Sequence, residues 1–346
     1  MANAADDKTL SNASAQTSFT SLGPYRLIQM LGMGGMGEVW RAEQTAPFHR
    51  IVALKLIKAG MDTRAVVARF ESERQALALM EHPNIAKVFD AGGTPEGRPY
   101  FVMEYVPGLP LTTYCDKHRL TIPDRLALFT QVCEGVQHAH QKAIIHRDLK
   151  PSNVLVGELN QKPVPKIIDF GLAKATGPRL SEDTMYTEVG GVVGTPDYMS
   201  PEQADSTERN IDTRTDVYSL GVILYELLVG SLPFTSHELR GGGTPAMLQK
   251  IRAEEPTLPS TKLKSLGGSS TDSAAKRQEE PQTLRRHLRG ELDWITMKAL
   301  EKDRTRRYGS PAELAADIQR HLRDEPVLAG PPSTSYRAGK FVRRHR

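Results

Sequence analysis

The stretch that decides the fold is His146-Arg147-Asp148-Leu149-Lys150-Pro151-Ser152-Asn153, and Asp169-Phe170-Gly171 follows it downstream. An acid, a lysine and an amide stand here at the spacing that a phosphoryl-transfer loop needs. Asp148 can accept the proton of an attacking hydroxyl, while Asn153 and Asp169 offer the oxygen ligands that magnesium prefers. Either motif alone would be a weak signal. Their order in one chain predicts a phosphoryl-transfer site.

A glycine-rich segment lies upstream, where Gly32, Gly34 and Gly37 form a G-x-G-x-x-G pattern between strand-like residues 25–31 and 38–42. A dinucleotide-binding turn carries the same glycines, but it must open a helix. A strand after Gly37 instead favours a hairpin over nucleotide phosphates. Without a Cβ in the way, the backbone N–H groups of such a hairpin approach phosphate oxygens closely.

Together these motifs resemble those of the bacterial eukaryotic-like serine/threonine protein kinases, the PknB-type (Hanks-type) family, over about 300 residues. Lys150, two residues after Asp148, matches the serine/threonine branch rather than the tyrosine branch. The resemblance implies an α+β, bilobal protein-kinase fold with a small β-rich N-lobe and a larger helical C-lobe. It also implies transfer of the γ-phosphoryl group of ATP to Ser/Thr hydroxyls, with Mg²⁺ or Mn²⁺, and activation by autophosphorylation of an activation loop.

The resemblance gives the catalytic residues their roles. Asp148 would be the base that orients the hydroxyl, and Lys150 would neutralise the transferring charge. Asn153 and Asp169 would hold the metal. Lys55, at the end of the strand Val52-Ala53-Leu54-Lys55, would reach the α- and β-phosphates.

Lys55 needs a carboxylate partner, and the helical pattern that follows it supplies one. Glu73 is the predicted partner, because it lies where the family carries its ion-pair glutamate, and Glu71 is the alternative. For a lone glutamate on such a helix, a solvated face would be the ordinary interpretation. The lysine upstream favours the ion pair.

The nucleotide site follows from the same resemblance. Met103 would be the gatekeeper, and the backbone from Glu104 to Val106 would form the hinge that binds adenine. The remaining predicted contacts are the phosphate-covering glycines and the residues around the base: Gly32, Gly34, Gly37, Val39, Ala53, Lys55 and Leu155. A plain core strand with a turn explains the hinge segment equally well, since adenine recognition uses backbone groups.

Residues 169–202 resemble an activation segment that closes on Ser200-Pro201-Glu202, where many relatives have Ala-Pro-Glu. Gly194-Thr195 matches a threonine that contacts the catalytic aspartate and lysine in serine/threonine kinases. Arg147 predicts a receptor for a phosphate in this segment, with Thr187 as the best acceptor and Thr184 second. Alternatively, Arg147 simply packs in the loop.

Two further residues are expected to support the loop. Asp216 would hydrogen-bond the catalytic-loop backbone, although it could otherwise be a helix N-cap. Arg307 is the expected partner of Glu202. His138 and His140 suggest metal ligands only superficially, because their i,i+2 spacing turns them apart on a helix; solvent exposure or core packing is favoured.

Composition agrees with a soluble globular kinase. A chain of 346 residues is long enough for two packed lobes. Its composition, 39% hydrophobic and 25% charged, is ordinary for a globular protein. No segment predicts a membrane span or a signal peptide, and two cysteines without metal-like spacing, Cys115 and Cys133, fit a reducing cytoplasm. A net charge of +4 is too mild to argue for nucleic acid.

The predicted organisation has four parts. Residues 1–20 are expected to be a disordered tail, 21–103 the N-lobe and 104–324 the C-lobe. An insertion at 236–289, rich in Gly, Ser and charge, is interpreted as a mobile surface loop rather than a substrate-docking element. Residues 325–346 are expected to be a Pro-rich linker with a basic, juxtamembrane-like tail.

The expected partners are protein substrates, with a homodimer for autophosphorylation and no nucleic acid. The basic tail could attach a cytoplasmic kinase domain to a membrane, or it could be ordinary solvated surface. Two rival functions remain open. A pseudokinase-like scaffold would lack Lys55, Asp148 or Asp169, and none is missing. A small-molecule phosphotransferase would not need the long activation segment.

Overall fold

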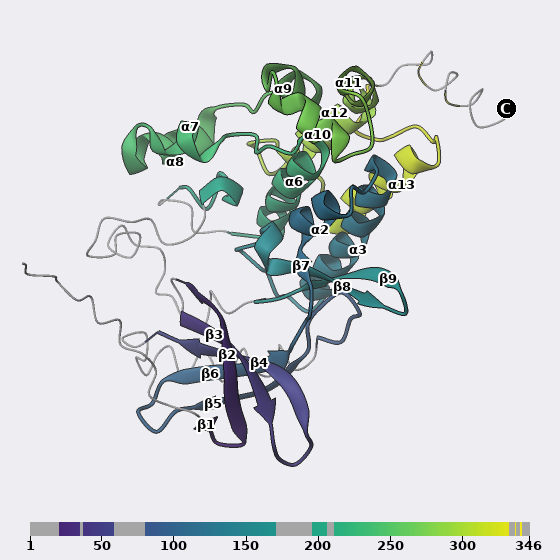
Figure 1. Cartoon of the computed structure of the whole chain (residues 1–346). Coiled ribbons are helices and arrows are strands. Elements are labelled where there is room, and N and C mark those ends of the chain that lie inside the picture. Colours follow the sequence, from purple (N-terminus) through teal and green to yellow (C-terminus); the bar gives the residue numbers. More distant parts are fainter. Residues whose placement is uncertain are drawn as a thin grey trace, which may run out of the picture.

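The computed structural model describes residues 21–34, 37–58, 80–170, 196–205 and 211–331, together with Tyr336 and Lys340. The N-terminal lobe is one antiparallel sheet, with the strands in the order β1-β2-β3-β4-β6-β5 (Figure 1). The strands are β1 (Ser21–Leu22), β2 (Tyr25–Gly34), β3 (Gly37–Gln44), β4 (Arg50–Ile57), β5 (Val88–Gly93) and β6 (Pro99–Glu104). The predicted strands on both sides of the glycines are confirmed, and β2 runs on through Gly32 to Gly34.

Alternation along β4 places the predicted lysine in the cleft. Val52, Leu54 and Leu56 face a small outer core that includes Leu22, Tyr25 and Val102. Ala53 and Ile57 belong instead to the main core of the molecule. Because successive side chains of a strand point to opposite faces, Lys55 lies on the same inner face as Ala53 and Ile57.

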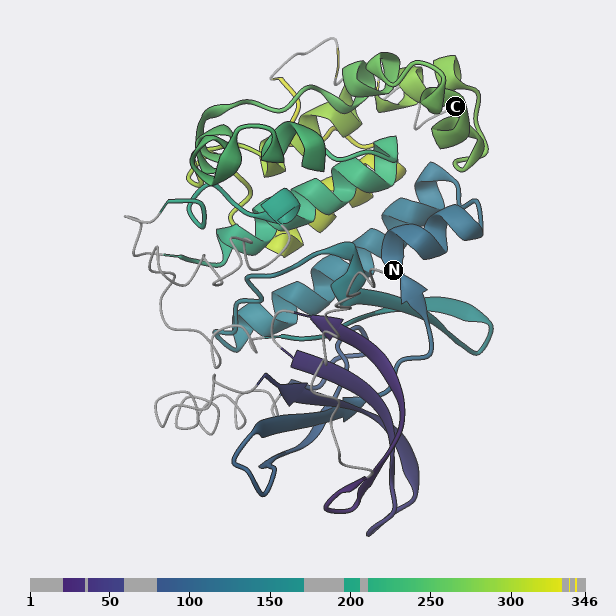
Figure 2. The ribbon, with the colours of Figure 1, turned by 60° about the vertical axis from the view of Figure 1, so that its left-hand side comes forward.

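The second lobe is helical, with one small sheet, in the order β7-β8-β9, at the edge that faces the N-lobe (Figure 1). The elements next to the cleft are β7 (Leu109–Pro110), α2 (Leu111–Lys117), α3 (Ile122–Gln141), the 3-10 turn η1 (Pro151–Asn153), β8 (Val154–Leu159), β9 (Lys162–Ile167) and the 3-10 turn η2 (Pro196–Tyr198). Figure 2 shows α3 beside the central helix α6 (Arg214–Val229). The bilobal α+β fold predicted from the sequence is confirmed.

Helix α6 forms the axis of this lobe. Every residue in it except Arg214 and Glu226 is buried, so it is apolar on all sides rather than amphipathic. It ends at Gly230, which takes the left-handed conformation (φ 79°) that glycine adopts without steric cost. The helix therefore provides a rigid support beneath the catalytic loop.

The interpretation of residues 236–289 as a mobile loop is wrong. The segment forms five helices: α7 (Ser236–Arg240), α8 (Gly243–Ala253), α9 (Pro259–Ser265), α10 (Ser269–Ala275) and α11 (Pro281–Leu288). Apolar side chains at wide spacing attach them to the lobe, among them Leu239, Leu263 and Leu284. Arg277 is also buried and donates to the Leu227 carbonyl near the end of α6 at 2.8 Å.

The lobe closes with α12 (Glu291–Ala299) and α13 (Pro311–Leu322). Beyond α13 the chain packs back on the lobe, where Val327 is buried and the Tyr336 ring stands edge-on to Trp294. Lys340 is 5% exposed and pairs with Glu291. At these described positions the chain is part of the lobe rather than a free linker. None of the helices in the described ranges is both long and apolar enough to cross a bilayer.

Candidate active site

Asp216, near the start of α6, holds the catalytic loop in place. Its carboxylate accepts hydrogen bonds from the backbone amides of His146 (2.8 Å) and Arg147 (2.9 Å), as predicted. The Nε2 atom of His140 lies 2.7 Å from the same carboxylate. Burial alone would raise the pKa of Asp216, but the hydrogen bonds and positive charge of His140 and His146 outweigh it and lower the pKa. Asp216 therefore stays ionised at the base of the loop.

The three predicted loop residues meet at Asp148. Lys150 Nζ lies 2.9 Å from Asp148 Oδ2. The Asn153 amide nitrogen donates to the Asp148 carbonyl at 2.7 Å and to its carboxylate at 3.3 Å. The side chain of Asp148 is about one third exposed, at 35%, so a hydroxyl can reach it while the lysine and the amide hold it in position.

Asp169 stands opposite this cluster and pairs with Lys55. Lys55 Nζ lies 2.8 Å from Asp169 Oδ2, and only 7% of the lysine side chain is exposed. Asp169 has a left-handed backbone (φ 63°), which few residues other than glycine adopt without cost. The amide of the preceding Ile168 donates to the Asn153 carbonyl at 2.9 Å, so the two predicted metal ligands lie on directly bonded segments.

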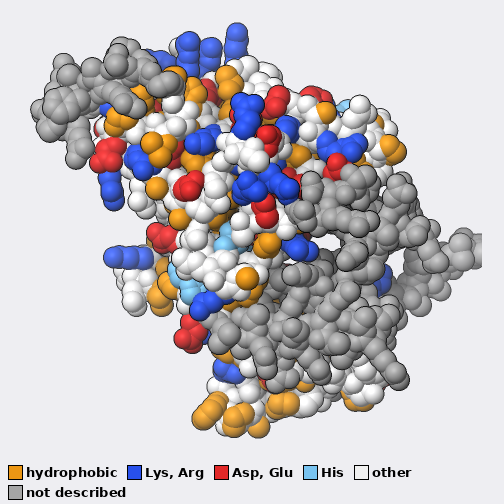
Figure 3. Space-filling model, turned by 180° about the vertical axis from the view of Figure 1, so that it is seen from behind, with side chains coloured by type: hydrophobic (Ala, Val, Ile, Leu, Met, Phe, Trp, Pro, Cys, Tyr) orange, Lys and Arg blue, Asp and Glu red, His pale blue; other side chains and the backbone are white. Residues whose placement is uncertain are grey.

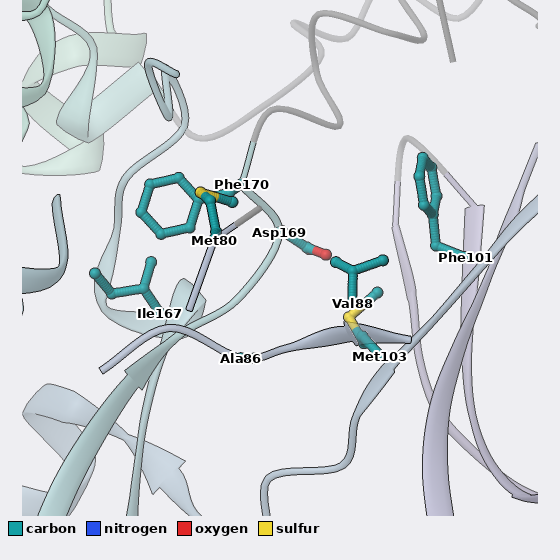
Figure 4. Close-up of a pocket in the computed structure, with 8 residues that line it drawn as sticks. All are labelled: Met80, Ala86, Val88, Phe101, Met103, Ile167, Asp169 and Phe170. Carbon is teal, nitrogen blue, oxygen red and sulfur yellow. The ribbon is translucent and has the colours of Figure 1, made fainter. Parts of the chain in front are cut away.

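A small apolar pocket lies behind this pair. Met80, Ile167 and Phe170 line one side and Val88 and Met103 the other, with the Asp169 carboxylate between them; Ala86 and Phe101 complete it (Figure 4). Met103, the predicted gatekeeper, is therefore buried at the inner edge of the cleft. Ala53 pairs with it across β4 and β6.

The predicted hinge follows Met103 at the end of β6. The Glu104 amide donates to the Lys87 carbonyl at 2.8 Å, and its carboxylate pairs with Lys166 at 3.0 Å. Since the amide and the carboxylate of Glu104 have these partners, its backbone carbonyl is the group that is left to bind an adenine base. Val106 is buried, while Val39 and Leu155 are half-buried on β3 and β8.

Other predicted residues are only partly placed. Gly32 and Gly34 lie in β2, where an added Cβ would meet no described atom within 4 Å. Gly37 has φ 138° and leaves no room for a Cβ beside the Leu56 carbonyl. The predicted Lys55 partner Glu73, its alternative Glu71, and the activation-segment residues Thr184, Thr187, Gly194 and Thr195 lie outside the described residues.

The expected pair of Glu202 and Arg307 is present. Both guanidinium Nη atoms donate to the two Glu202 carboxylate oxygens at 2.8 Å, and Arg307 is fully buried. Thr215 donates to the same carboxylate at 2.7 Å. Burial alone would raise the pKa of Glu202, but Arg307 and Thr215 outweigh it and lower the pKa. The end of the activation segment is thereby fixed to the core of the lobe.

Sequence reasoning missed two contacts of the site. The first is the Lys55–Asp169 ion pair, which links residues far apart in the chain. The second is the contact of His140 with the Asp216 carboxylate: the side chain is buried, as the core-packing alternative expected, but its partner was not predicted. The spacing of six residues between His140 and His146 could have pointed to it, since it brings both histidines to the start of one loop.

The donor set suits a hard divalent cation. Because Asn153 donates through its amide nitrogen, its side-chain oxygen is left for a metal, and Asp169 supplies a carboxylate. Magnesium is commonly held by one or two such protein ligands together with substrate phosphates. Within the described ranges no group of three or more His, Cys, Asp and Glu could hold a metal by itself.

Comparisons with known proteins agree with this geometry. The family described as "Protein kinase domain" matches residues 25–318. The chain is similar to "Serine/threonine-protein kinase PknB" of Mycobacterium tuberculosis (strain H37Rv), with 34% identity over 310 residues, covering 88% of this chain and 44% of that protein. It is also similar to "Serine/threonine-protein kinase Pkn1" of Myxococcus xanthus, with 39% identity over 241 residues, covering 69% and 33%. The chain thus spans less than half the length of these two relatives.

A solved structure shares the fold. The kinase domain of Mycobacterium tuberculosis PknI, in its C20A_R136N double mutant, matches with a TM-score of 0.62 at 24% identity. The match covers 89% of this chain and all of that one. Taken with the family match over residues 25–318, the fold and the site geometry show that this chain belongs to the protein kinase family.

Proposed function

We propose that this chain is an ATP-dependent protein serine/threonine kinase that transfers the γ-phosphoryl group to Ser/Thr hydroxyls of protein substrates. One observation carries the proposal. Lys150 and Asn153 both contact Asp148, while Lys55 contacts Asp169 on the opposite side of the same cleft. Protein kinases use these residue types in this arrangement for phosphoryl transfer.

Most of the rate enhancement in such a site comes from positioning and charge stabilisation. Asp148 would accept a hydrogen bond from the substrate hydroxyl and orient it in line with the transferred group. Lys150, at 2.9 Å from Asp148, would stabilise the negative charge of the transferring phosphoryl oxygens. The Asp216 carboxylate keeps this loop in place by accepting hydrogen bonds from two of its backbone amides.

Asn153 and Asp169 would hold a magnesium or manganese ion, which would supply neutralisation of the phosphate charge when bound. Lys55 would exchange its contact with Asp169 for the α- and β-phosphates, and Glu73 is proposed to hold the lysine at that stage. The adenine would lie near Met103, against Val39, Ala53 and Leu155, with the backbone of Glu104 and Val106 as its hydrogen-bond partners.

The decisive experiment replaces the proposed base. Asp148→Asn keeps the size and the hydrogen bonds of the side chain but cannot accept the hydroxyl proton. We expect phosphoryl transfer from radiolabelled ATP to a protein substrate to fall by about 10² to 10⁴-fold, with unchanged circular dichroism. Asp272→Asn on the exposed face of α10 is a matched control and should retain activity.

Equal transfer by wild type and Asp148→Asn would falsify the assignment and favour a scaffold that binds partners without turnover. Transfer to small molecules but not to proteins would indicate a small-molecule phosphotransferase instead. Phosphosite mapping by mass spectrometry separates these outcomes.

Activation by autophosphorylation is a further part of the proposal. Among the described residues, the buried Nε atom of Arg147 has no hydrogen-bond partner, which supports a role as receptor for a phosphate. Thr187 and Thr184 are the proposed acceptors, in a reaction between two copies of the chain. A Thr184→Ala/Thr187→Ala variant should lose most of its activity. Full activity of that variant, with both threonines unmodified in active wild type, would contradict this proposal.

Attachment of a cytoplasmic kinase domain to a membrane through the basic tail is a separate proposal, and the position of Lys340 argues against part of it. Of the basic residues expected to face lipid, Lys340 is 5% exposed and is already paired with Glu291 and Asp324. It cannot contribute to lipid binding in this position. Arg337, Arg343, Arg344 and Arg346 lie outside the described residues.

A further inference from the structure

Helix α11 presents an arginine face to solvent. Leu284 and Leu288 are fully buried against the lobe. Arg285 and Arg286 of this helix, and Arg289 directly after its last residue, are exposed on the opposite side, at i, i+1 and i+4. Figure 3 shows Lys and Arg side chains gathered at the end of the C-lobe where the helices of residues 236–289 lie.

Two carboxylates next to this face in the sequence have other partners. Glu279 lies 2.8 Å from His287, and Glu291 lies 2.9 Å from Lys340. Within the described part of the chain, Arg285, Arg286 and Arg289 pair with no carboxylate. In that part, Arg286 makes only weak bonds within its own helix, to the Gln282 carbonyl at 3.3 Å and to the Thr283 hydroxyl at 3.4 Å.

The helix dipole accounts for the positive charge but not for the choice of arginine. Each cation at a helix C-terminus gains about 0.3–1 kcal/mol from the helix dipole. Like charges at i,i+3 and i,i+4 lose about 0.2–0.5 kcal/mol per pair, and Arg286/Arg289 and Arg285/Arg289 are two such pairs. The repulsion offsets only part of the gain, so basic residues are favoured here, but lysines would serve the helix as well as arginines.

The geometry of the face suits a phosphate group. Residues three and four apart on a helix have Cβ atoms about 5–6 Å apart, so their long side chains can converge on one anion. Guanidinium groups bind phosphate oxygens in a bidentate manner, which lysines cannot do. A phosphorylated side chain carries about −1.5 to −2 charges and three strong acceptor oxygens.

We propose that the Arg285/Arg286/Arg289 face of α11 docks a phosphoserine- or phosphothreonine-bearing segment of a protein partner. The proposal rests on the proposed kinase function, which would supply such segments as its products. In Figure 1, α11 lies at the end of the C-lobe away from the N-lobe sheet, so the docked phosphate is separate from the catalytic site. Docking there would raise the local concentration of a partner that still has hydroxyls to be phosphorylated.

A protein segment fits this face better than a membrane does. Helices that bind in the membrane interface place apolar side chains into the lipid beside their cationic residues. The apolar side chains of α11, Leu284 and Leu288, are instead buried within the lobe.

Fluorescence anisotropy with a labelled peptide that carries one phosphothreonine, and with its unphosphorylated twin, tests the proposal. The full chain with Asp148→Asn serves as the reference protein, so that binding does not depend on catalysis. The site variant adds R285Q, R286Q and R289Q. The control adds R26Q, R252Q and R306Q, which remove the same charge from exposed arginines that already have acidic partners.

We expect the phosphopeptide to bind the reference and control proteins with similar affinity, and the site variant at least about tenfold more weakly, at about 50 mM sodium chloride. Equal thermal midpoints of the three proteins would confirm that each is folded. Equal binding of both peptides, or an unchanged affinity of the site variant, would overturn the proposal. Loss of binding to phosphatidylserine vesicles in the site variant, without phosphopeptide binding by the reference protein, would assign the face to lipid. Because catalysis is blocked throughout, failure here leaves the proposed kinase function to its own test.

Discussion

Arg147 has a left-handed backbone (φ 67°), which costs a residue other than glycine about 1–3 kcal/mol. Bonds on both sides of the residue maintain it. Asp216 accepts from its amide at 2.9 Å, and Gln203 donates to its carbonyl at 2.7 Å. The neighbouring Asp148 is thereby aimed into the cleft by backbone geometry that these buried contacts impose.

The Glu202–Arg307 pair provides a stability test. Removing Arg307 leaves a buried carboxylate with an uncompensated charge, which typically costs about 3–5 kcal/mol. We expect Arg307→Met to lower the free energy of unfolding in urea by about that amount. The double variant Glu202→Gln/Arg307→Met should recover part of the loss, because the uncompensated charge is gone.

Arg306→Gln is the matched control for this pair, since the neighbouring arginine is exposed and its ion pair with Glu301 lies at the surface. It should change the free energy of unfolding by less than about 1 kcal/mol. A loss in Arg307→Met no larger than in Arg306→Gln would show that the buried pair contributes nothing to stability.

The proximity of single residues in the site could be predicted where it depends on sequence spacing. Asp148, Lys150 and Asn153 lie on one short loop, so their proximity follows from the chain itself. The Lys55–Asp169 contact depends on how two lobes close on each other, which no local pattern encodes. The partner of His140 was not predicted, because Asp216 lies on another helix of the same lobe.

At the scale of elements, the β2–β3 hairpin provides a second stability test. A Cβ on Gly37 would lie 2.0 Å from the Leu56 carbonyl oxygen, and its φ of 138° is a region that other residues rarely adopt. Gly37→Ala should therefore displace the hairpin from β4, costing about 1–3 kcal/mol. The thermal midpoint should fall and the KM for ATP should rise.

Gly32→Ala is the control for the hairpin, because a Cβ there meets no described atom within 4 Å. It should leave the thermal midpoint close to that of wild type. Equal thermal midpoints for the two variants would show that the close approach at Gly37 has no energetic consequence.

The helices of residues 236–289 show where sequence patterns are insufficient. The buried apolar positions in α9 to α11 are sparse, separated by Gly, Ser and charged residues, and none of these three helices exceeds eight residues. Much of the attachment is polar. Arg277 donates to backbone carbonyls at the end of α6, and the buried Arg125 of α3 donates to the Lys276 carbonyl at 2.7 Å. Arginine is mostly found at protein surfaces, so sequence alone provides no reason to expect Arg125 and Arg277 in the core. The packed insertion therefore resembles a loop in its sequence.

At the scale of the whole molecule, the two lobes are connected by a backbone bridge near the hinge. Ile167 at the end of β9 donates to the Asn84 carbonyl at 2.8 Å, and Ala86 donates back to Ile167 at 2.9 Å. The Asn84 side chain adds a bond to the Pro165 carbonyl at 2.9 Å. These bonds fix the end of β9, which leads directly to Asp169, to the segment that precedes β5.

The segment after α13 is joined to the same framework through Glu291 at the start of α12. His321 and Lys340 lie 2.6 and 2.9 Å from one carboxylate oxygen, and Tyr336 donates to the other at 2.7 Å. Burial alone would raise the pKa of Glu291, but these three partners outweigh it and lower the pKa from 4.5 to about 2. The ionised carboxylate thus ties residues beyond α13 to the lobe.

A depressed pKa contributes its full stabilisation only while the group is ionised in both the folded and the unfolded state. The contribution of Glu291 is therefore complete above about pH 4.5 and declines as the pH falls toward about 2. Glu291→Gln should be less stable than wild type at neutral pH, and the difference between their free energies of unfolding in urea should shrink below about pH 4.5. Glu96→Gln, in an exposed loop, should stay close to wild type throughout. A Glu291→Gln difference that does not change with pH would mean that packing around residue 291, rather than its charge, holds the C-terminal segment to the lobe.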